Sequence, residues 1–267
     1  TGTADIRLSQ DDGTTWGSTA ITENTVDINA GSFTWTVPGT AFPDTAKIKV
    51  ALDGDESATI GYRGISPTFK IVPYLKLLFP NATGLSYSIG DVVYIKWTPY
   101  PDSFGNVDIT YDTNSGSGGY TNNIILGHPA NTKPNGTDYG YEWTIPNVAG
   151  IVGSKVRIKV FWSGKEATCF DNSLYDFAIK GTITLTGEAN GGPAVVWKNG
   201  DSKAITWNYT GDIGLVDIYY STDGGETYAY DVVTGVSVGT GGSGSYLWSP
   251  IPDDVIANDR NTTIRFK

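Results

Sequence analysis

Acidic side chains are the residues of this sequence best suited to chemistry, because Ca²⁺ takes roughly six to eight oxygen ligands from carboxylates and carbonyls. The densest acidic cluster is Asp53-Gly54-Asp55-Glu56, and acidic pairs occur at Asp11-Asp12 and Asp253-Asp254. None of them follows the D-x-[DN]-x-[DN]-G order of a calcium-binding loop. We therefore interpret them first as solvated turn residues. If the chain binds a cation, Asp53, Asp55 and Glu56 are the candidate calcium ligands, and no other cofactor is expected.

Nucleophilic and general-base catalysis need combinations of residues that the sequence lacks. It has one histidine, His128, and one cysteine, Cys169, so neither a Ser-His-Asp triad nor a His-rich zinc site can be assembled within the chain. His128 is interpreted as a loop residue before Pro129. Cys169 is interpreted as a small buried residue with no partner for an intramolecular disulfide. We expect no catalytic residue and no enzyme activity.

Four asparagines begin the N-x-[ST] pattern that N-glycosylation requires, namely Asn81, Asn135, Asn208 and Asn261. The pattern arises often by chance in a chain that is rich in Asn and Thr. Asn81 and Asn135 fall in predicted loops and are the candidate glycosylation sites. Asn208 and Asn261 fall at the ends of predicted strands.

The charge of the chain excludes two classes of partner. Its 267 residues carry a formal net charge of −10 and the sequence pI is near 4.5. Nucleic acids and anionic membrane surfaces attract clustered Lys and Arg, so neither is an expected partner. The sequence also has no apolar run of about 18 residues, and we expect no membrane insertion within this segment.

The elements that position these residues repeat along the chain. An aspartate between two apolar residues occurs three times, at Ala4-Asp5-Ile6, Val107-Asp108-Ile109 and Val216-Asp217-Ile218. A tryptophan-containing phrase follows each copy, at Trp35, Trp143 and Trp248. The period is about 105–110 residues, which is the size of one β-sandwich domain.

Within each unit, apolar and polar residues alternate with the period of a β-strand, as in Val156-Arg157-Ile158-Lys159-Val160. Such alternation predicts antiparallel sheets with one face in a core and one face in water. In the middle unit we predict seven strands, near 75–79, 92–97, 107–111, 123–126, 141–145, 155–162 and 175–180. This number suits an immunoglobulin or fibronectin type III topology.

The repeat phase predicts three units, at 1–72, 73–180 and 181–267. The first has no counterpart of Leu77–Trp97, and the last has no counterpart of Tyr175–Lys180. We therefore expect tandem immunoglobulin-like antiparallel sandwiches in a chain that begins and ends within a repeat. The connections between units are very short, at Ile71–Leu75 and Ile179–Ile183, and short connections favour a stiff rod.

Five tryptophans lie on the predicted inward faces of strands: Trp35, Trp97, Trp143, Trp207 and Trp248. A platform for stacking sugars is the alternative interpretation. Because the same position recurs in each copy, we predict that these side chains pack in the cores.

The stretch Ser9-Gln10-Asp11-Asp12-Gly13-Thr14-Thr15-Trp16 resembles the Asp-box turn of sialidases and related β-propellers, and residues 221–228 fit with Tyr in the last place. The middle copy departs from it after Asp112. In such a turn the aspartate accepts backbone N–H groups and glycine supplies a positive φ, so its role is structural. The resemblance carries over no catalytic residue. Propeller blades repeat at roughly 40–50 residues, which disagrees with the period here.

Taken together, phrases such as V-D-I-x-Y-S-x-D-G-G-x-T-Y followed by G-S-Y-x-W resemble the immunoglobulin-like repeats of microbial cell-surface proteins. These include surface-layer proteins, adhesins and extracellular filaments. The resemblance implies an extracellular location at the cell surface and a structural role without chemistry. Repeats that contact mainly their neighbours suit such a role.

Three functions remain open. The first is a building block of a surface-layer lattice or filament, whose partners are other copies of the parent surface protein. The second is a carbohydrate- or partner-binding adhesin module that uses exposed aromatic residues such as Tyr100, Tyr120, Trp162 and Tyr230. The third is an accessory region of a secreted glycoside hydrolase.

Overall fold

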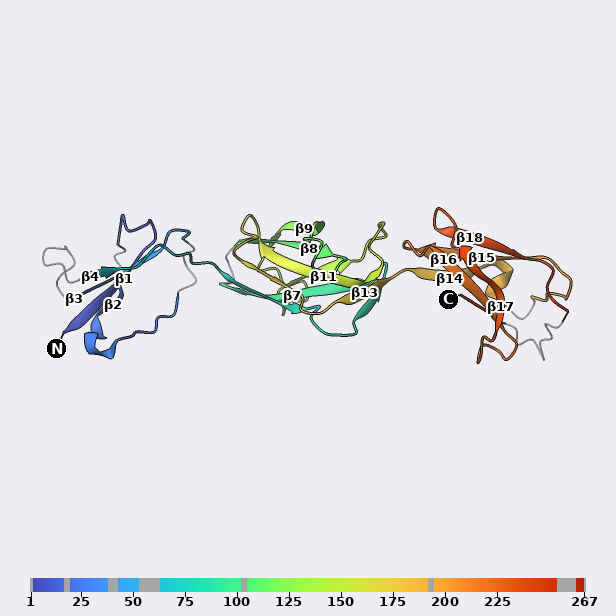
Figure 1. The fold of residues 1–267 in the computed structure, drawn as a ribbon, viewed down its shortest axis with the longest axis horizontal. Coiled ribbons are helices and arrows are strands. Elements are labelled where there is room, and N and C mark those ends of the chain that lie inside the picture. Colours follow the sequence, from blue (N-terminus) through green and yellow to red (C-terminus); the bar gives the residue numbers. More distant parts are fainter. Residues whose placement is uncertain are drawn as a thin grey trace.

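The computed structural model describes residues 2–16, 20–37, 43–52, 63–101, 105–191, 195–253 and 263–266. Its strands form three units that follow one another in chain order along the long axis of the molecule (Figure 1). The described ranges contain no α-helix, only the two short 3-10 turns η1 (Ile28–Ala30) and η2 (Gly187–Asn190).

The middle unit is a sandwich of two sheets. One sheet has the order β10 (Gly140–Thr144), β7 (Val92–Tyr100), β5 (Tyr74–Phe79). The other has the order β6 (Ser86–Ser88), β13 (Phe177–Lys180), β11 (Gly153–Trp162), β8 (Asn106–Asp112), β9 (Asn122–Pro129), and β12 (Phe170–Asn172) also pairs with β11. All seven predicted strands are present, and β6 and β12 are additional. The result confirms an all-β fold of immunoglobulin-like antiparallel sandwiches.

The third unit has the same two layers. One sheet contains β14 (Thr182–Thr186), β15 (Lys203–Thr210) and β18 (Ser243–Trp248), and the other contains β17 (Tyr230–Ser237), β16 (Leu215–Ser221) and β19 (Thr263–Phe266). In both units, alternate residues of facing strands interdigitate in a core. Ile95 and Ile158 are fully buried in the middle unit, as are Ile205 and Ile218 in the third.

The N-terminal unit has one sheet among its described residues, with the order β2 (Ala20–Asp27), β1 (Thr3–Ser9), β3 (Lys47–Leu52), β4 (Arg63–Ile65). Residues 31–37 contain the tryptophan phrase but form no strand. In the middle unit the equivalent phrase forms β10, which pairs with β7. Because the described part of the N-terminal unit offers no counterpart of β7, this segment has no strand to pair with.

Four of the five repeated tryptophans pack in the cores as predicted, but Trp35 is only half-buried. The indole N–H of Trp97 donates to the carbonyl of Ala130 at 2.9 Å, and that of Trp207 donates to the carbonyl of Val238 at 2.8 Å. Both buried indoles therefore have a hydrogen-bond partner, as a buried polar group requires. The prediction for Trp35 was wrong because residues 31–37 form no strand, so no sheet holds this side chain on an inward face.

Candidate functional site

The predicted calcium ligands Asp53, Asp55 and Glu56 lie outside the described residues. Among the residues that the structure does describe, no three His, Cys, Asp or Glu side chains come together in a way that would hold a metal ion. The cation hypothesis therefore stays a prediction for residues 53–56.

The Ser-Asp turn at residues 9–15 is a closed hydrogen-bond ring. Ser9 Oγ donates to Asp11 Oδ1 at 2.8 Å and accepts the Gly13 N–H at 2.8 Å. Asp11 also accepts from the backbone N–H of Thr15 at 2.8 Å and from its hydroxyl at 2.6 Å. These bonds favour the charged carboxylate, led by that from the Thr15 hydroxyl, and they lower the pKa of Asp11 to about 2.

The third unit repeats this ring residue for residue. Ser221 donates to Asp223 and accepts the Gly225 N–H, while Asp223 accepts from both the backbone and the hydroxyl of Thr227. The hydrogen bond from Ser221, followed by those from Thr227, holds the pKa of Asp223 far below its usual range. The oxygen atoms of both carboxylates accept hydrogen bonds from N–H and O–H groups of their own turns. Their role is to fix a turn.

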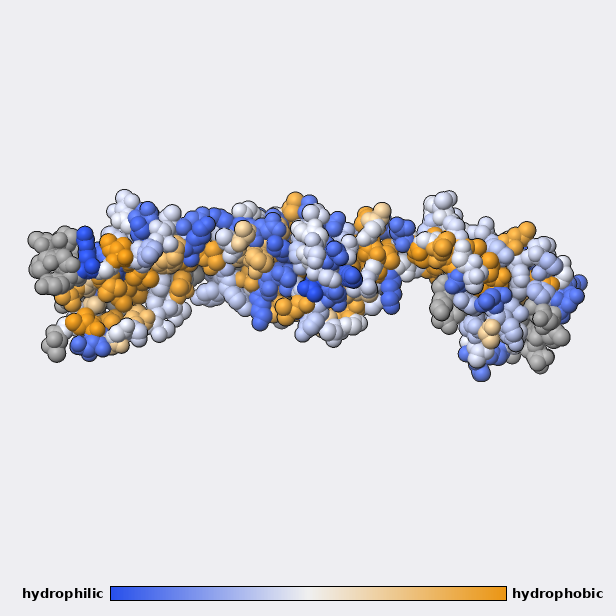
Figure 2. Space-filling view, in the orientation of Figure 1, coloured by the Kyte–Doolittle hydropathy of each residue, from blue (hydrophilic) through white to orange (hydrophobic). Residues whose placement is uncertain are grey.

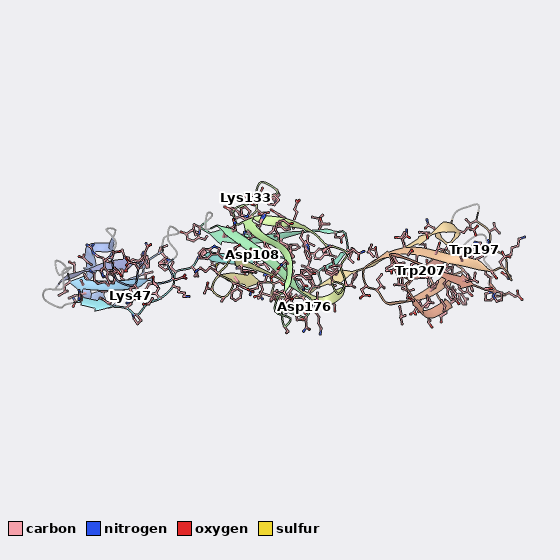
Figure 3. The ribbon with its side chains drawn as sticks, turned by 90° about the horizontal axis from the view of Figure 1, so that it is seen from above. Lys47, Asp108, Lys133, Asp176, Trp197 and Trp207 are labelled. Carbon is pink, nitrogen blue, oxygen red and sulfur yellow. The ribbon has the colours of Figure 1, made fainter. Side chains whose placement is uncertain are left out.

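The aspartate of the repeated V-D-I phrase has a structural role. The sequence analysis found the repeat but predicted no role for this residue. Asp108 Oδ1 accepts the Gly127 N–H and the Ser163 hydroxyl, each at 2.7 Å, and Asp217 Oδ1 accepts the Gly235 N–H at 2.7 Å. Figure 3 shows Asp108 among the strands of the middle unit. Both glycines have a φ of +68°, at irregularities in the pairing of the aspartate strand. The repeated aspartate therefore fastens a β-bulge that needs glycine.

The sequence analysis predicted that the lone histidine lies in a loop, but the structure places it near the end of β9. The His128 ring packs edge-on against Trp97 and Tyr141, at centroid distances of 5.9 and 5.2 Å. Partial burial lowers the pKa of His128 below its usual value. Its Nε2 lies 3.3 Å from the Gly140 carbonyl. His128 therefore fills a rim of the core between two aromatic rings.

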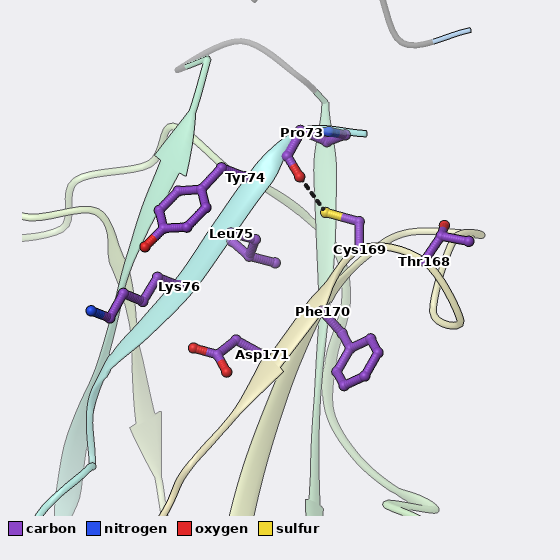
Figure 4. A pocket seen from close by; sticks show the side chains of 8 residues that line it. All are labelled: Pro73, Tyr74, Leu75, Lys76, Thr168, Cys169, Phe170 and Asp171. Atoms are coloured by element: carbon purple, nitrogen blue, oxygen red, sulfur yellow. Dashed lines mark hydrogen bonds between the residues drawn. The ribbon is translucent and has the colours of Figure 1, made fainter. Parts of the chain in front are cut away.

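The lone cysteine is buried, as predicted, with 4% of its surface exposed. Its thiol donates to the carbonyl of Pro73 at 3.1 Å (Figure 4). Burial raises the pKa of Cys169 to about 11. Cys169 lines a groove of about 390 Å³ together with β5 and β12 residues that include Tyr74, Lys76, Phe170 and Asp171 (Figure 4).

The two candidate glycosylation sites differ in their surroundings. Asn135 is exposed, and its Oδ1 accepts the N–H groups of Thr137 and Asp138. Its Nδ2 donates to Asp138 at 3.1 Å. Asn81 is half-buried and its Oδ1 accepts the Leu174 N–H at 2.8 Å. Both side chains organise local backbone, and their glycosylation stays a prediction.

The four aromatic residues expected to serve an adhesin are spread over two units. Tyr100 is exposed at the end of β7, whereas Tyr120 and Trp162 are half-buried in the middle unit. Tyr230 belongs to the third unit, where it stacks on Tyr220 at 5.0 Å. Tyr230 therefore packs against a tyrosine of its own unit and not against the other three aromatic residues.

The middle and third units contact each other at their junction, in addition to being linked by the polypeptide chain. Gly181 is the one residue between β13 and β14. Across this junction Gly211 donates its N–H to Asn147 Oδ1 at 2.9 Å. A Cβ on Gly211 would lie 2.7 Å from Val152 and 2.9 Å from Ile89, so the glycine backbone packs directly against the middle unit.

No family model matches this sequence, and no curated protein is similar to it. The solved structures that match this chain include a chain from the crystal structure of Dpr2 Ig1-Ig2 in complex with DIP-Theta Ig1-Ig3, at 12% identity, a TM-score of 0.25 and coverage of 98% of this chain and 88% of that one. A marsupial T cell receptor has 8% identity, a TM-score of 0.28 and coverage of 100% and 91%. Extracellular domains 3-5 of Drosophila OTK have 10% identity, a TM-score of 0.27 and coverage of 99% and 84%. These likenesses are too distant to bear on function, and the immunoglobulin-like assignment stands on the strand pairing itself. The described part of the chain contains no helix that is long and apolar enough to cross a membrane.

Proposed function

We propose that residues 1–267 are a stiff, non-enzymatic structural segment of a large extracellular surface protein, of the kind that builds a surface-layer lattice or a filament. Its partners are then other copies of the parent protein. The repeated carboxylates support this role, because they are consumed in holding turns and bulges. Such residues serve the module rather than a substrate.

The junction at Gly211 is the observation that carries the proposal. A single residue separates β13 from β14, and Gly211 packs against Ile89 and Val152 while its N–H is bound by Asn147. A module that only displays a binding site tolerates a loose linker. A load-transmitting array needs neighbouring units that keep one orientation.

Stiffness is testable by electron paramagnetic resonance distance measurement. Spin labels placed at Leu126→Cys and Leu247→Cys, both at exposed positions and in different units, report the distribution of distances between those units. The Cys169→Ala background removes the native thiol. We expect one narrow distance distribution, whereas a broad one contradicts the proposal. Electron microscopy of the native material then separates a lattice or a filament from dispersed monomers.

A second candidate is an adhesin module that binds a glycan or a protein. The groove beside Cys169 favours it, because Tyr74 and Phe170 are exposed aromatic residues next to the polar Lys76 and Asp171. Aromatic faces with adjacent polar groups suit a small amphipathic ligand. Saturable binding of a glycan by the monomer, lost in Tyr74→Ala, would support this candidate.

A further inference from the structure

One face of the N-terminal sheet gathers positive charge. Arg7 of β1 pairs with Lys49 of β3, and Lys49 pairs in turn with Ile65 of β4. Two residues further along the strands, Asp5 and Arg63 lie on either side of β3. Residues that pair directly, or stand two positions apart in a strand, point to the same face of a sheet, so these side chains are neighbours. In Figure 2 hydrophobic and hydrophilic residues gather on different parts of this unit.

Lys49 is the buried cation of this cluster. It is 5% exposed, and its ammonium group lies 5.0 Å from the centre of the Trp16 ring. Burial, followed by the positive charges of Arg7 and Arg63, lowers the pKa of Lys49, whereas Asp5 acts in the opposite direction. A buried cation beside two other cations is unfavourable unless negative charge is close by.

The equivalent lysine of the middle unit has such a negative partner. Lys159 pairs with Thr110 at the register position where Lys49 pairs with Arg7. The neighbour on β8 is therefore neutral, and Glu166 binds the Lys159 ammonium group at 2.9 Å. In contrast, none of the ion pairs between described residues involves Lys49. The N-terminal unit has more positive charge at this position and no carboxylate in place of Glu166.

We propose that Arg7, Lys49 and Arg63 form a binding site for an oxyanion of the carboxylate or sulfate type. Arg63 is exposed and takes part in none of the ion pairs between described residues. Its guanidinium group makes the first contact, because paired N–H donors match the oxygen atoms of such an anion. Lys49 adds positive charge from beneath, where the Trp16 ring holds its ammonium group.

The oxyanion has two possible sources, a free anion or an acidic side chain of another copy of this chain. A net charge of −10 means that the surface of a second copy is rich in carboxylates, which complement the site. The second source rests on the proposed function, whereas the anion site itself does not.

The chain also has carboxylates of its own that the test must exclude. Asp53, Asp55 and Glu56 follow β3 in the sequence and precede β4, and they lie outside the described residues. If they neutralised the cluster, the site would not need an external anion.

A titration of the full chain with sodium sulfate tests the site. Sodium chloride keeps the ionic strength constant, so that charge screening does not change. NMR signals of Lys49 and Arg63 should shift saturably, and the pKa of Lys49 should rise because a bound anion stabilises the charged amine. The absence of a saturable shift at up to about 10 mM sulfate, a very weak affinity, overturns the proposal.

Two variants locate the bound sulfate. Arg63→Gln removes the exposed guanidinium and should weaken sulfate binding by at least ~10-fold, the effect of losing one hydrogen bond to a charged group. Lys133→Gln removes an exposed cation of the middle unit and should leave binding unchanged. Circular dichroism checks that both variants fold. Equal weakening in the two variants would show a general effect of charge and overturn the site.

Two further measurements identify the source of the anion. Analytical ultracentrifugation measures self-association, and an association weakened by both sulfate and Arg63→Gln assigns the anion to another copy. Sulfate binding without self-association supports the anion site and counts against the proposed function alone. The variant Asp53→Asn/Asp55→Asn/Glu56→Gln should bind sulfate as tightly as the native chain. If only this variant binds sulfate, the chain's own carboxylates fill the site and the proposal is overturned.

Discussion

Gly211 of the third unit donates its backbone N–H to the side chain of Asn147 in the middle unit, at 2.9 Å. The glycine has a φ of +86°, and a Cβ built on it would lie 2.7 Å from Val152 and 2.9 Å from Ile89. A side chain at this position would be strained by the backbone and would also collide with the middle unit. The orientation of the two units therefore depends on a residue without a Cβ.

Replacing this glycine should loosen the junction. Gly211→Ala is expected to broaden the distance distribution between labels at Leu126→Cys and Leu247→Cys, since the new Cβ displaces Val152. Gly214→Ala is the matched control, because Gly214 also has a positive φ but open space around it. Both variants carry the same backbone strain, so only the lost contact distinguishes them. Equal distributions in the two variants would contradict a role for Gly211 in the junction.

The tryptophan of β15 should be a major determinant of stability. Trp207→Ala removes a fully buried ring and leaves the Val238 carbonyl without its donor, so we expect a loss of ~3–5 kcal/mol. Denaturant unfolding measures this loss. Trp207→Phe keeps most of the volume and should cost ~1–3 kcal/mol, chiefly for the lost hydrogen bond. A loss below ~1 kcal/mol in Trp207→Ala would place the ring outside the core.

The Asp11 turn should titrate at low pH. Its carboxyl pKa falls from the usual 3.8 to about 2, and the largest cause is the Thr15 hydroxyl. A depressed pKa in the folded state means that the stabilisation is complete above about pH 4 and is lost as the pH falls through about 2. An NMR titration of the Asp11 carboxyl measures the midpoint directly.

Two threonine variants test whether the Thr15 hydroxyl lowers the pKa of Asp11. Thr15→Val should raise the pKa of Asp11, because it deletes the hydroxyl donor while the backbone bond remains. Thr14→Val, its neighbour, should leave the titration where it is. A midpoint unmoved by Thr15→Val would show that the hydroxyl is not what stabilises the carboxylate.

The single cysteine should resist modification in the folded chain. With a pKa of about 11, about one thiol in a thousand is ionised at pH 8, and the side chain is buried as well. A thiol reagent such as dithionitrobenzoate should therefore react slowly until denaturant is added. Ser117→Cys, in the hairpin between β8 and β9, serves as a reactive control. Stoichiometric reaction of native Cys169 within minutes would rule out its burial.

Alternation and repetition predicted most of the middle unit, because strand side chains point to opposite faces whatever surrounds them. Val156, Ile158 and Val160 are buried as their spacing indicates. The same reasoning failed for His128, since a residue before proline looks like a loop residue although here it ends a strand. The role of Asp108 was also missed. Its glycine partner, Gly127, lies 19 positions away, and no local pattern links the two.

The amino-acid sequence by itself determined the repeat, the strand positions and the inward-facing residues of each unit, because these depend on neighbours along the chain. Only the tertiary structure decided whether an inward-facing residue is buried. Trp143 and Trp35 stand in equivalent phrases, yet Trp143 is buried on a strand that pairs with β7, whereas Trp35 is half-buried in a described segment that forms no strand. Burial is a property of two surfaces, and a sequence pattern specifies one of them at a time.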